Sequence, residues 1–83
     1  MYQIMFLNEQ GLEVANHNQD EIIFSGSAKA ICRGEAITVN TLVIDLNENQ
    51  VILKDYERQT SIKMTYQDFM NVNFKNIHYS KGL

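Results

Sequence analysis

The sequence of 83 residues predicts a single all-β or mostly β domain over residues 1–83. We expect a small antiparallel barrel or sandwich of about six or seven short strands with one or two helical turns. Three observations indicate this class. Residues 36–66 hold three runs of β-forming side chains separated by polar breaks, residues 61–66 alternate between polar and apolar, and the hydrophobic content of 45% is that of a globular protein.

The central segment 36–66 is expected to form a three-stranded meander. Along residues 61–66 the apolar side chains share one face, because a strand points successive side chains to opposite sides. The β-rich run 51–58 comes before it, and residues 57–59 suffice for a short hairpin loop. Residues 47–50 supply the other turn, since Asn tolerates positive φ and hydrogen-bonds its own backbone.

The first strand of this meander has an irregular pattern. Its apolar positions change from odd to even numbers at Asn40 and Thr41, within residues 37–46. A β-bulge there would absorb one residue and bend the strand, as a small barrel or a strongly coiled sheet requires. Two alternatives remain at this point: the strand is buried on both faces, or two short strands meet at Asn40.

Upstream of the meander, the apolar run 2–7 predicts a strand. Gly11 is free to adopt positive φ, so residues 12–14 are expected to return as the second strand of a hairpin. Residues 16–20 are polar and predict a loop.

Residues 21–24 open another strand, and the residues after it have two interpretations. In the first, the strand continues to Cys32, turns at residues 33–35 and pairs back along residues 37–46, with the small residues near the bulge. In the second, residues 27–33 form a short helix that stops at a glycine. We favour the long hairpin, because a helix of seven residues is marginal without strong packing.

At the end of the chain, Thr65 and Asp68 form a weak variant of the capping box, which predicts a helical turn at residues 66–70. Apolar residues then alternate from Met70 to Phe74, which predicts a closing strand. A longer helix within residues 66–79, using Ile77, competes with this interpretation. A strand, a helical turn and a closing strand also end many small barrels, including SH3-like ones, a likeness of architecture alone.

Composition limits the compartment and the source. One cysteine excludes an intramolecular disulfide, and no apolar run approaches the roughly 20 residues that span a membrane. No signal peptide is recognisable at the start. Asn and Ile each occur nine times, a bias that resembles small proteins of AT-rich genomes and of their phages. We therefore expect a protein of the cytoplasm of a bacterial host.

The residues that carry catalysis or bind metals do not form a recognisable set. The two histidines, His17 and His78, and the lone Cys32 lack zinc-ligand spacing. We expect Cys32 to be a small core residue and His17 to be solvated. Asp55 and Glu57 are predicted to share a solvated strand face. No phosphate-binding loop or nucleophile elbow is present. The sequence therefore predicts a non-enzymatic protein without metal or cofactor.

Charge is unevenly distributed along the chain. Residues 1–28 carry four acidic residues and no Lys or Arg, whereas residues 51–83 carry five basic and three acidic residues. The leading hypothesis is a protein that binds another protein, and more specifically a phage- or mobile-element-encoded inhibitor of a bacterial defence or nucleic-acid-handling protein with a basic surface. The candidate contacts are Glu9, Glu13, Asp20 and Glu21. A homodimer would also relieve the small core of so short a chain.

The alternative hypothesis is a homodimeric RNA-binding regulator. On the predicted strand 51–58, Tyr56 stands between Lys54 and Arg58, as on a stacking platform for single strands. Lys63 belongs to the same candidate set. A similar grouping of an aromatic residue with basic residues occurs near the end of the chain, at His78, Tyr79 and Lys81. The net charge of −3 offers little for phosphate neutralisation, so nucleic acid is the weaker prediction.

Three short segments, at residues 34–39, 49–52 and 61–64, resemble the carbon storage regulator family of RNA-binding dimers. The resemblance covers less than half of the chain and implies the alternative function above. The basic residue that this family uses for RNA would fall near Thr65, and the turn proline of the family is missing. We take the likeness as that of a general three-stranded meander and claim no membership.

Overall fold

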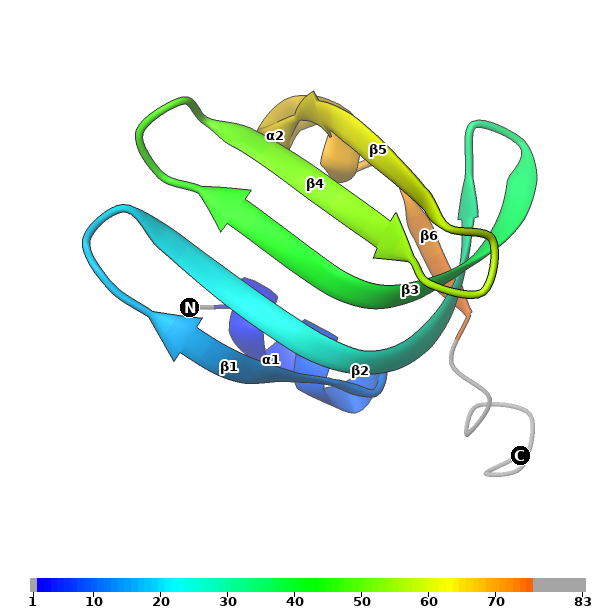
Figure 1. Ribbon diagram of the computed structural model, residues 1–83, viewed down its shortest axis with the longest axis horizontal. Helices are drawn as coiled ribbons and strands as arrows, with labels where there is room; N and C mark the ends of the chain where they lie inside the picture. The colour runs from blue at the N-terminus through cyan, green and yellow to red at the C-terminus, as the bar shows by residue number, and fades with distance from the viewer. Residues whose placement is uncertain (1, 76–83) are drawn as a thin grey trace.

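The computed structural model describes the backbone of residues 2–75 and the side chains of residues 6–74. Its elements are α1 (Tyr2–Glu9), β1 (Leu12–His17), β2 (Glu21–Cys32), β3 (Glu35–Asp45), β4 (Gln50–Asp55), β5 (Thr60–Thr65), α2 (Tyr66–Phe69) and β6 (Asn73–Lys75). All six strands form one antiparallel sheet in the order β1-β2-β3-β4-β5 (Figure 1). The sixth strand, β6, pairs with β2 on the edge that β2 also offers to β1. The predicted mostly β fold is confirmed.

The long hairpin of β2 and β3 is the framework of the sheet, as the favoured interpretation predicted. Ten residue pairs connect the two strands, from Glu21 opposite Asp45 to Cys32 opposite Glu35. Arg33 and Gly34 both have positive φ, at 53° and 83°, which matches the right-handed twist of the flanking strands. The alternative helix at residues 27–33 is wrong. Alternate residues of this stretch face the core and its backbone pairs with β3, and this pairing outweighs a local preference for helix.

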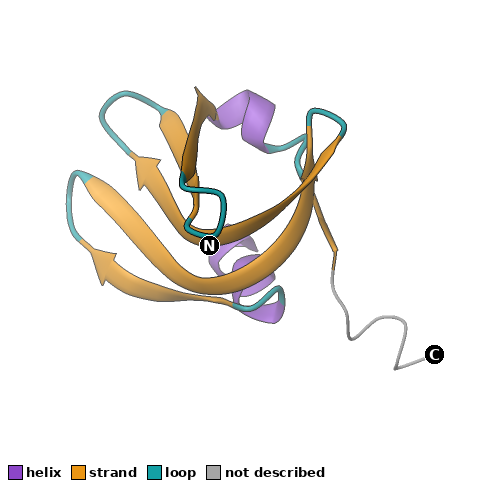
Figure 2. Ribbon diagram, turned by 45° about the vertical axis from the view of Figure 1, so that its right-hand side comes forward, coloured by secondary structure: helices purple, strands orange, loops and turns teal. Residues whose placement is uncertain are grey.

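An irregularity lies where the sequence pattern shifts, but its extra residue belongs to β2. Ser25 is opposite Thr41 and Ala28 is opposite Val39, so two residues of β2 stand against Asn40 alone. The prediction of a bulge within β3 is corrected accordingly. The buried pairs Ala28–Val39 and Phe24–Leu42 lie on either side of this irregularity, so the inward positions of β3 change there from odd to even numbers. Figure 2 shows that the long strands of the sheet curve strongly.

The predicted meander is confirmed in β3, β4 and β5. Asn49 and Gln59 adopt positive φ, at 59° and 55°, in the two turns that connect these strands. The middle strand is shorter than predicted, because β4 ends at Asp55 and residues 56–59 form the turn. The cause is a side-chain hydrogen bond: Asp55 accepts the Arg58 N–H and so folds the chain back early.

The N-terminal strand prediction is wrong, because residues 2–9 form helix α1. The run contains a single β-branched residue and several good helix formers, and short apolar runs do not distinguish helix from strand. Leu7 is fully buried, and Gly11, with φ of 103°, lets the chain reverse into β1. The second strand of the predicted hairpin does exist, but it pairs with β2 and extends to His17.

The C-terminal prediction of a helical turn and a closing strand is confirmed over the described residues. The Thr65 hydroxyl oxygen accepts the Asp68 N–H at 3.0 Å and caps the single turn of α2. The chain then enters β6, so the longer helix is wrong. Ile77, which that helix would have used, lies outside the described residues.

Both helices contribute to one core on the inward face of the sheet. Leu7 of α1 and Phe69 of α2 join a cluster with inward residues of the strands, among them Phe24, Leu42 and Leu53. Cys32 is buried in this cluster as a free thiol, as predicted. The sheet curves around the cluster but does not close, because within the described residues β5 pairs only with β4. The expected barrel is therefore an open, strongly curved sheet.

Candidate functional site

Two turns lie side by side at one end of the sheet and bring acidic residues together. The turns connect β1 to β2 and β3 to β4 (Figure 1, left). The Leu46 N–H donates to the Asp20 carbonyl oxygen at 2.8 Å, and the Asn47 side-chain amide donates to the Asp20 carboxylate at 2.9 Å. Glu21 stands opposite Asp45 across the two central strands. We define the acidic end as Asp20, Glu21, Asp45 and Glu48.

Hydrogen bonds from side chain to backbone shape both turns. Asn18 Oδ1 accepts the N–H groups of Asp20 at 2.7 Å and of Glu21 at 3.0 Å. In the neighbouring turn, Asp45 Oδ1 accepts the N–H groups of Asn47 and Glu48, each at 3.0 Å. Such local bonds hold the backbone of a turn in one conformation. The carboxylates are therefore carried on defined backbone positions.

The acidic end has no described cation to balance it. No described Lys or Arg forms an ion pair with any of its four carboxylates. Asp20 and Glu48 are exposed, while Glu21 and Asp45 are partly buried. Like charges on adjacent turns add to a local negative potential that a cationic surface would neutralise. This arrangement suits recognition of a basic partner.

Only two of the four predicted acidic contact residues lie at the acidic end. Asp20 and Glu21 lie at the acidic end. Glu13 instead pairs with Ser25, four residues farther along β2, which is about 13 Å at the usual rise of a strand. Glu9 belongs to α1. The prediction missed Asp45 and Glu48, although the predicted hairpin already placed residue 45 near residue 21.

The four residues proposed for RNA binding do not share one strand face. Lys54 and Lys63 lie on β4 and β5, but Tyr56 and Arg58 belong to the turn after β4. The Tyr56 hydroxyl is 2.6 Å from the Thr41 hydroxyl, and Arg58 Nε is 4.0 Å from an Asp55 carboxylate oxygen. The additional residues His78, Tyr79 and Lys81 lie outside the described part of the chain.

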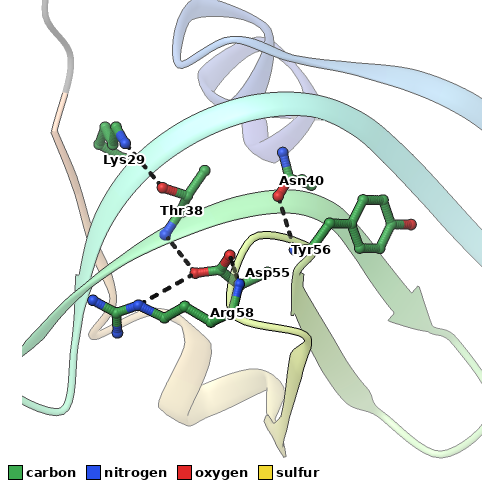
Figure 3. A network of polar contacts seen from close by, with 6 residues as sticks. All are labelled: Lys29, Thr38, Asn40, Asp55, Tyr56 and Arg58. Atoms are coloured by element: carbon green, nitrogen blue, oxygen red, sulfur yellow. Dashed lines mark hydrogen bonds and ion pairs between the residues drawn. The ribbon is translucent and has the colours of Figure 1, made fainter.

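Asp55 is buried, which corrects the prediction of a solvated carboxylate. Only 5% of the residue is exposed, and its two oxygens accept the N–H groups of Thr38 and Arg58, each at 3.1 Å (Figure 3). Burial alone would raise the pKa of this carboxyl. The backbone N–H groups of Thr38, Arg58 and Glu57, together with the Arg58 guanidinium, outweigh burial and hold the pKa below its ordinary value.

The polar network around Asp55 connects three strands and a turn. Lys29 Nζ donates to the Thr38 hydroxyl at 2.9 Å, and the Tyr56 N–H donates to the Asn40 side chain at 3.0 Å (Figure 3). Each of these contacts fixes the β4–β5 turn or β2 against β3. The network is accordingly part of the framework, and it carries no carboxylate pair or nucleophile arranged for catalysis.

A hollow of about 400 Å³ lies between the β2–β3 turn and the connection from α2 to β6. Its lining includes the charged residues Arg33 and Asp68 and the apolar residues Met64 and Val72. The lining also includes Cys32, whose thiol is part of the core. These titratable residues do not form a nucleophile–base pair, so the hollow gives no basis for an enzymatic proposal.

Comparisons with protein-family models, with curated proteins and with solved structures find no match to this chain. Across the described residues, no helix is long and apolar enough to cross a membrane. Within the same part of the chain, no group of three or more His, Cys, Asp or Glu residues is placed to hold a metal ion.

Proposed function

We propose that this chain is a non-enzymatic binding protein that contacts another protein through the acidic end. The observation that carries the proposal is the juxtaposition of two hydrogen-bonded turns with four carboxylates and no described cation in an ion pair with them. Charges held on defined turns guide encounter with a surface of opposite charge and favour partners that match it. The expected partner has a basic patch.

The finer proposal is that the chain inhibits a bacterial defence or nucleic-acid-handling protein and is encoded by a phage or mobile element. Proteins that handle nucleic acids carry basic surfaces, because they neutralise phosphates. An acidic end could occupy such a surface and exclude the nucleic acid. The small size and the bias towards Asn and Ile support this origin. It predicts action in the cytoplasm of a bacterial host.

RNA binding is a second candidate, because Lys54 and Lys63 lie on neighbouring strands and the Tyr56 side chain is 61% exposed. Its ring remains available for stacking on a base although its hydroxyl contacts Thr41. This candidate predicts salt-sensitive RNA binding that is lost in Tyr56→Ala. RNA binding that is absent, or independent of salt, would exclude it.

The first experiment is capture from a bacterial lysate, with and without nuclease, using the full tagged chain. One variant, Glu21→Lys/Glu48→Lys, reverses charge at the acidic end. The matched control, Glu13→Lys/Glu35→Lys, reverses two exposed carboxylates elsewhere. Each reversal adds two charges, so both variants change the net charge from −3 to +1.

We expect the unmodified chain and the control to retain a discrete protein after nuclease treatment, and the acidic-end variant to lose it. Retention of that protein by all three chains would refute the electrostatic proposal. Capture that depends on intact nucleic acid would instead support the RNA-binding candidate.

A further inference from the structure

The outward face of the sheet carries a row of apolar side chains that no described element covers. Ile23, Val43 and Ile52 are opposite one another on β2, β3 and β4. Their sequence neighbours, among them Phe24, Leu42 and Leu53, are in the core, so the row faces the other way. The three side chains are partly buried and absent from the core cluster, while Leu7 and Phe69 bring both helices to the core side.

Charged and polar residues lie on both sides of this row. On one side Asp45 is opposite Gln50, and on the other Thr41 is opposite Lys54. These residues share the outward face with Val43 and Ile52, because each is two positions away from one of them. The row thus has a carboxylate at one flank and an ammonium group at the other, separated by four residues along the strands, which is about 13 Å.

We propose that two copies of the chain stack through this outward face, related by a two-fold axis that runs along the apolar row. Rotation about such an axis brings the outward faces of the two copies into contact. It also places the flank of one copy that carries Lys54 against the flank of the other copy that carries Asp45. Lys54 of each copy then faces Gln50 of the other and reaches the neighbouring Asp45. The apolar row packs against its own symmetry mate, as self-complementary interfaces require.

The charge pattern selects this arrangement over the other ways to cover the face. A two-fold axis parallel to the strands is less favourable in either position. Centred on β3, it would place Asp45 opposite its own mate, which costs free energy through like-charge repulsion. Centred between β3 and β4, it would place Ile23 opposite Lys63 and lose the apolar packing. The sheet edges are less suited to pairing, because β1 has an irregular register near Val14 and β5 carries Lys63. The proposed axis places Lys63, which ends the apolar row, opposite its own mate, but Lys63 is exposed at the rim, where water and salt screen its charge.

The interface is small, so the dimer is expected to be weak. Four strands spaced about 4.8 Å apart and five residues long give a face of about 320 Å² per copy, which is below the size of stable specific interfaces and in the range of weak association. A dissociation constant on the order of 10 μM fits such an interface. Asp45 belongs both to the acidic end and to this interface, whereas the exposed Asp20 and Glu48 lie outside the row, so each dimer would still present two pairs of exposed acidic turn residues.

Sedimentation analysis of the full chain over a range of concentrations tests this proposal. Ile52→Lys places a charge in the apolar row and should weaken the dimer at least about tenfold. Met70→Lys is the matched control, because Met70 is 53% exposed and lies at the end of α2, away from the row. The midpoint of thermal unfolding shows whether each variant remains folded.

A charge exchange tests the register directly. Lys54→Glu and Gln50→Lys should each weaken the dimer, because each brings like charges together across the two-fold axis. The double variant should restore it, since Glu at 54 then faces Lys at 50 of the other copy. A monomeric wild type, a dimer that Ile52→Lys leaves intact, or a double variant no better than the single ones would overturn the proposal. These measurements use the chain without a partner, so their failure is distinguishable from a failure of partner binding, although Asp45 contributes to both surfaces.

Discussion

Asp55 shows how a single side chain sets the geometry of the β4–β5 turn. Its carboxylate bonds the N–H of Thr38 on β3 and the N–H of Arg58 in the turn. One residue thereby ends β4, closes the turn and fixes that turn to the neighbouring strand. A buried carboxylate is tolerated because donors surround it.

We predict that Asp55→Asn lowers the midpoint of thermal unfolding by several degrees at neutral pH. The amide group carries no charge and directs its own N–H groups towards backbone donors, so hydrogen bonds are lost. Glu57→Gln, at an exposed neighbouring position, is the control and should leave the midpoint unchanged. Thermal melts followed by circular dichroism provide the measurement.

The same variant has a defined pH dependence. The folded-state pKa of Asp55 lies below the ordinary value of 3.8, so its carboxylate stabilises the fold above that pH. This contribution disappears as the pH falls through the lowered pKa. The difference between wild type and Asp55→Asn in the midpoint of thermal unfolding should therefore become smaller in acid. A gap that is constant from pH 7 to the acid limit would contradict the role given to Asp55.

At the scale of the elements, the close approach of the α1–β1 connection to β2 depends on two glycines. A Cβ on Gly26 would lie far inside van der Waals contact of the Gly11 carbonyl oxygen, and a Cβ on Gly11 would lie 2.6 Å from the Ser27 carbonyl oxygen. The Ser27 N–H also donates to the Gly11 carbonyl at 3.2 Å. The chain reversal after α1 is therefore in direct contact with the part of β2 where the register of the sheet shifts.

We predict that Gly26→Ala destabilises the protein by about 3 kcal/mol or more, because backbone atoms would have to move. Gly34→Ala is the matched control. Gly34 also has positive φ, but no atom lies within 4 Å of the position that a Cβ would occupy there, so a cost of about 1 kcal/mol is expected. Urea unfolding measures both. Equal losses at the two positions would show that close approach of the strands is not the cause.

The cap of α2 gives a further prediction at this scale. Thr65→Ala removes the hydroxyl that accepts the Asp68 N–H and should cost about 1 kcal/mol. Thr65→Ser retains an acceptor and should recover most of this loss. Urea unfolding of the two variants distinguishes the cap from other effects of shortening the side chain, because Ser also lacks the methyl group.

Local patterns predicted most elements, and the failures have identifiable causes. The long hairpin and the meander followed from alternation and from polar breaks, which are local signals. Helix α1 could not be separated from a strand, since Leu7 is buried in either case. The end of β4 depended on a local turn in which Asp55 accepts the Arg58 N–H, and the run of β-forming residues up to Arg58 concealed this turn. The extra residue at Gly26 depended on contact with Gly11, which is tertiary structure that composition does not show.

At the scale of the whole molecule, the acidic end is a product of strand order. Asp20 and Glu48 are distant in sequence and become neighbours only because β2 and β3 pair along their full length. The distribution of charge along the sequence led to the prediction that Glu9 and Glu13 act together with Asp20. In the structure, Glu13 lies on β1 opposite Ser25, on another part of the surface. A prediction that combined charge with the predicted hairpin could have found Asp45.

Salt provides a test of the site at this scale. Binding through exposed carboxylates should weaken as the ionic strength rises, because ions screen exposed charges beyond a Debye length of about 10 Å at 0.1 M. We expect association with the partner to slow more than dissociation accelerates. Surface-binding kinetics at several salt concentrations would reveal this pattern. Affinity independent of salt would favour an apolar contact instead.

The most direct measurement of the central claim is the affinity of the captured partner for three versions of the chain. These are the unmodified protein, Glu21→Lys/Glu48→Lys and the charge-matched Glu13→Lys/Glu35→Lys. We predict that the acidic-end variant binds at least about tenfold more weakly, while the control stays within about twofold of the unmodified chain. Equal affinities, or equal weakening in both variants, would contradict a contact made through the acidic end.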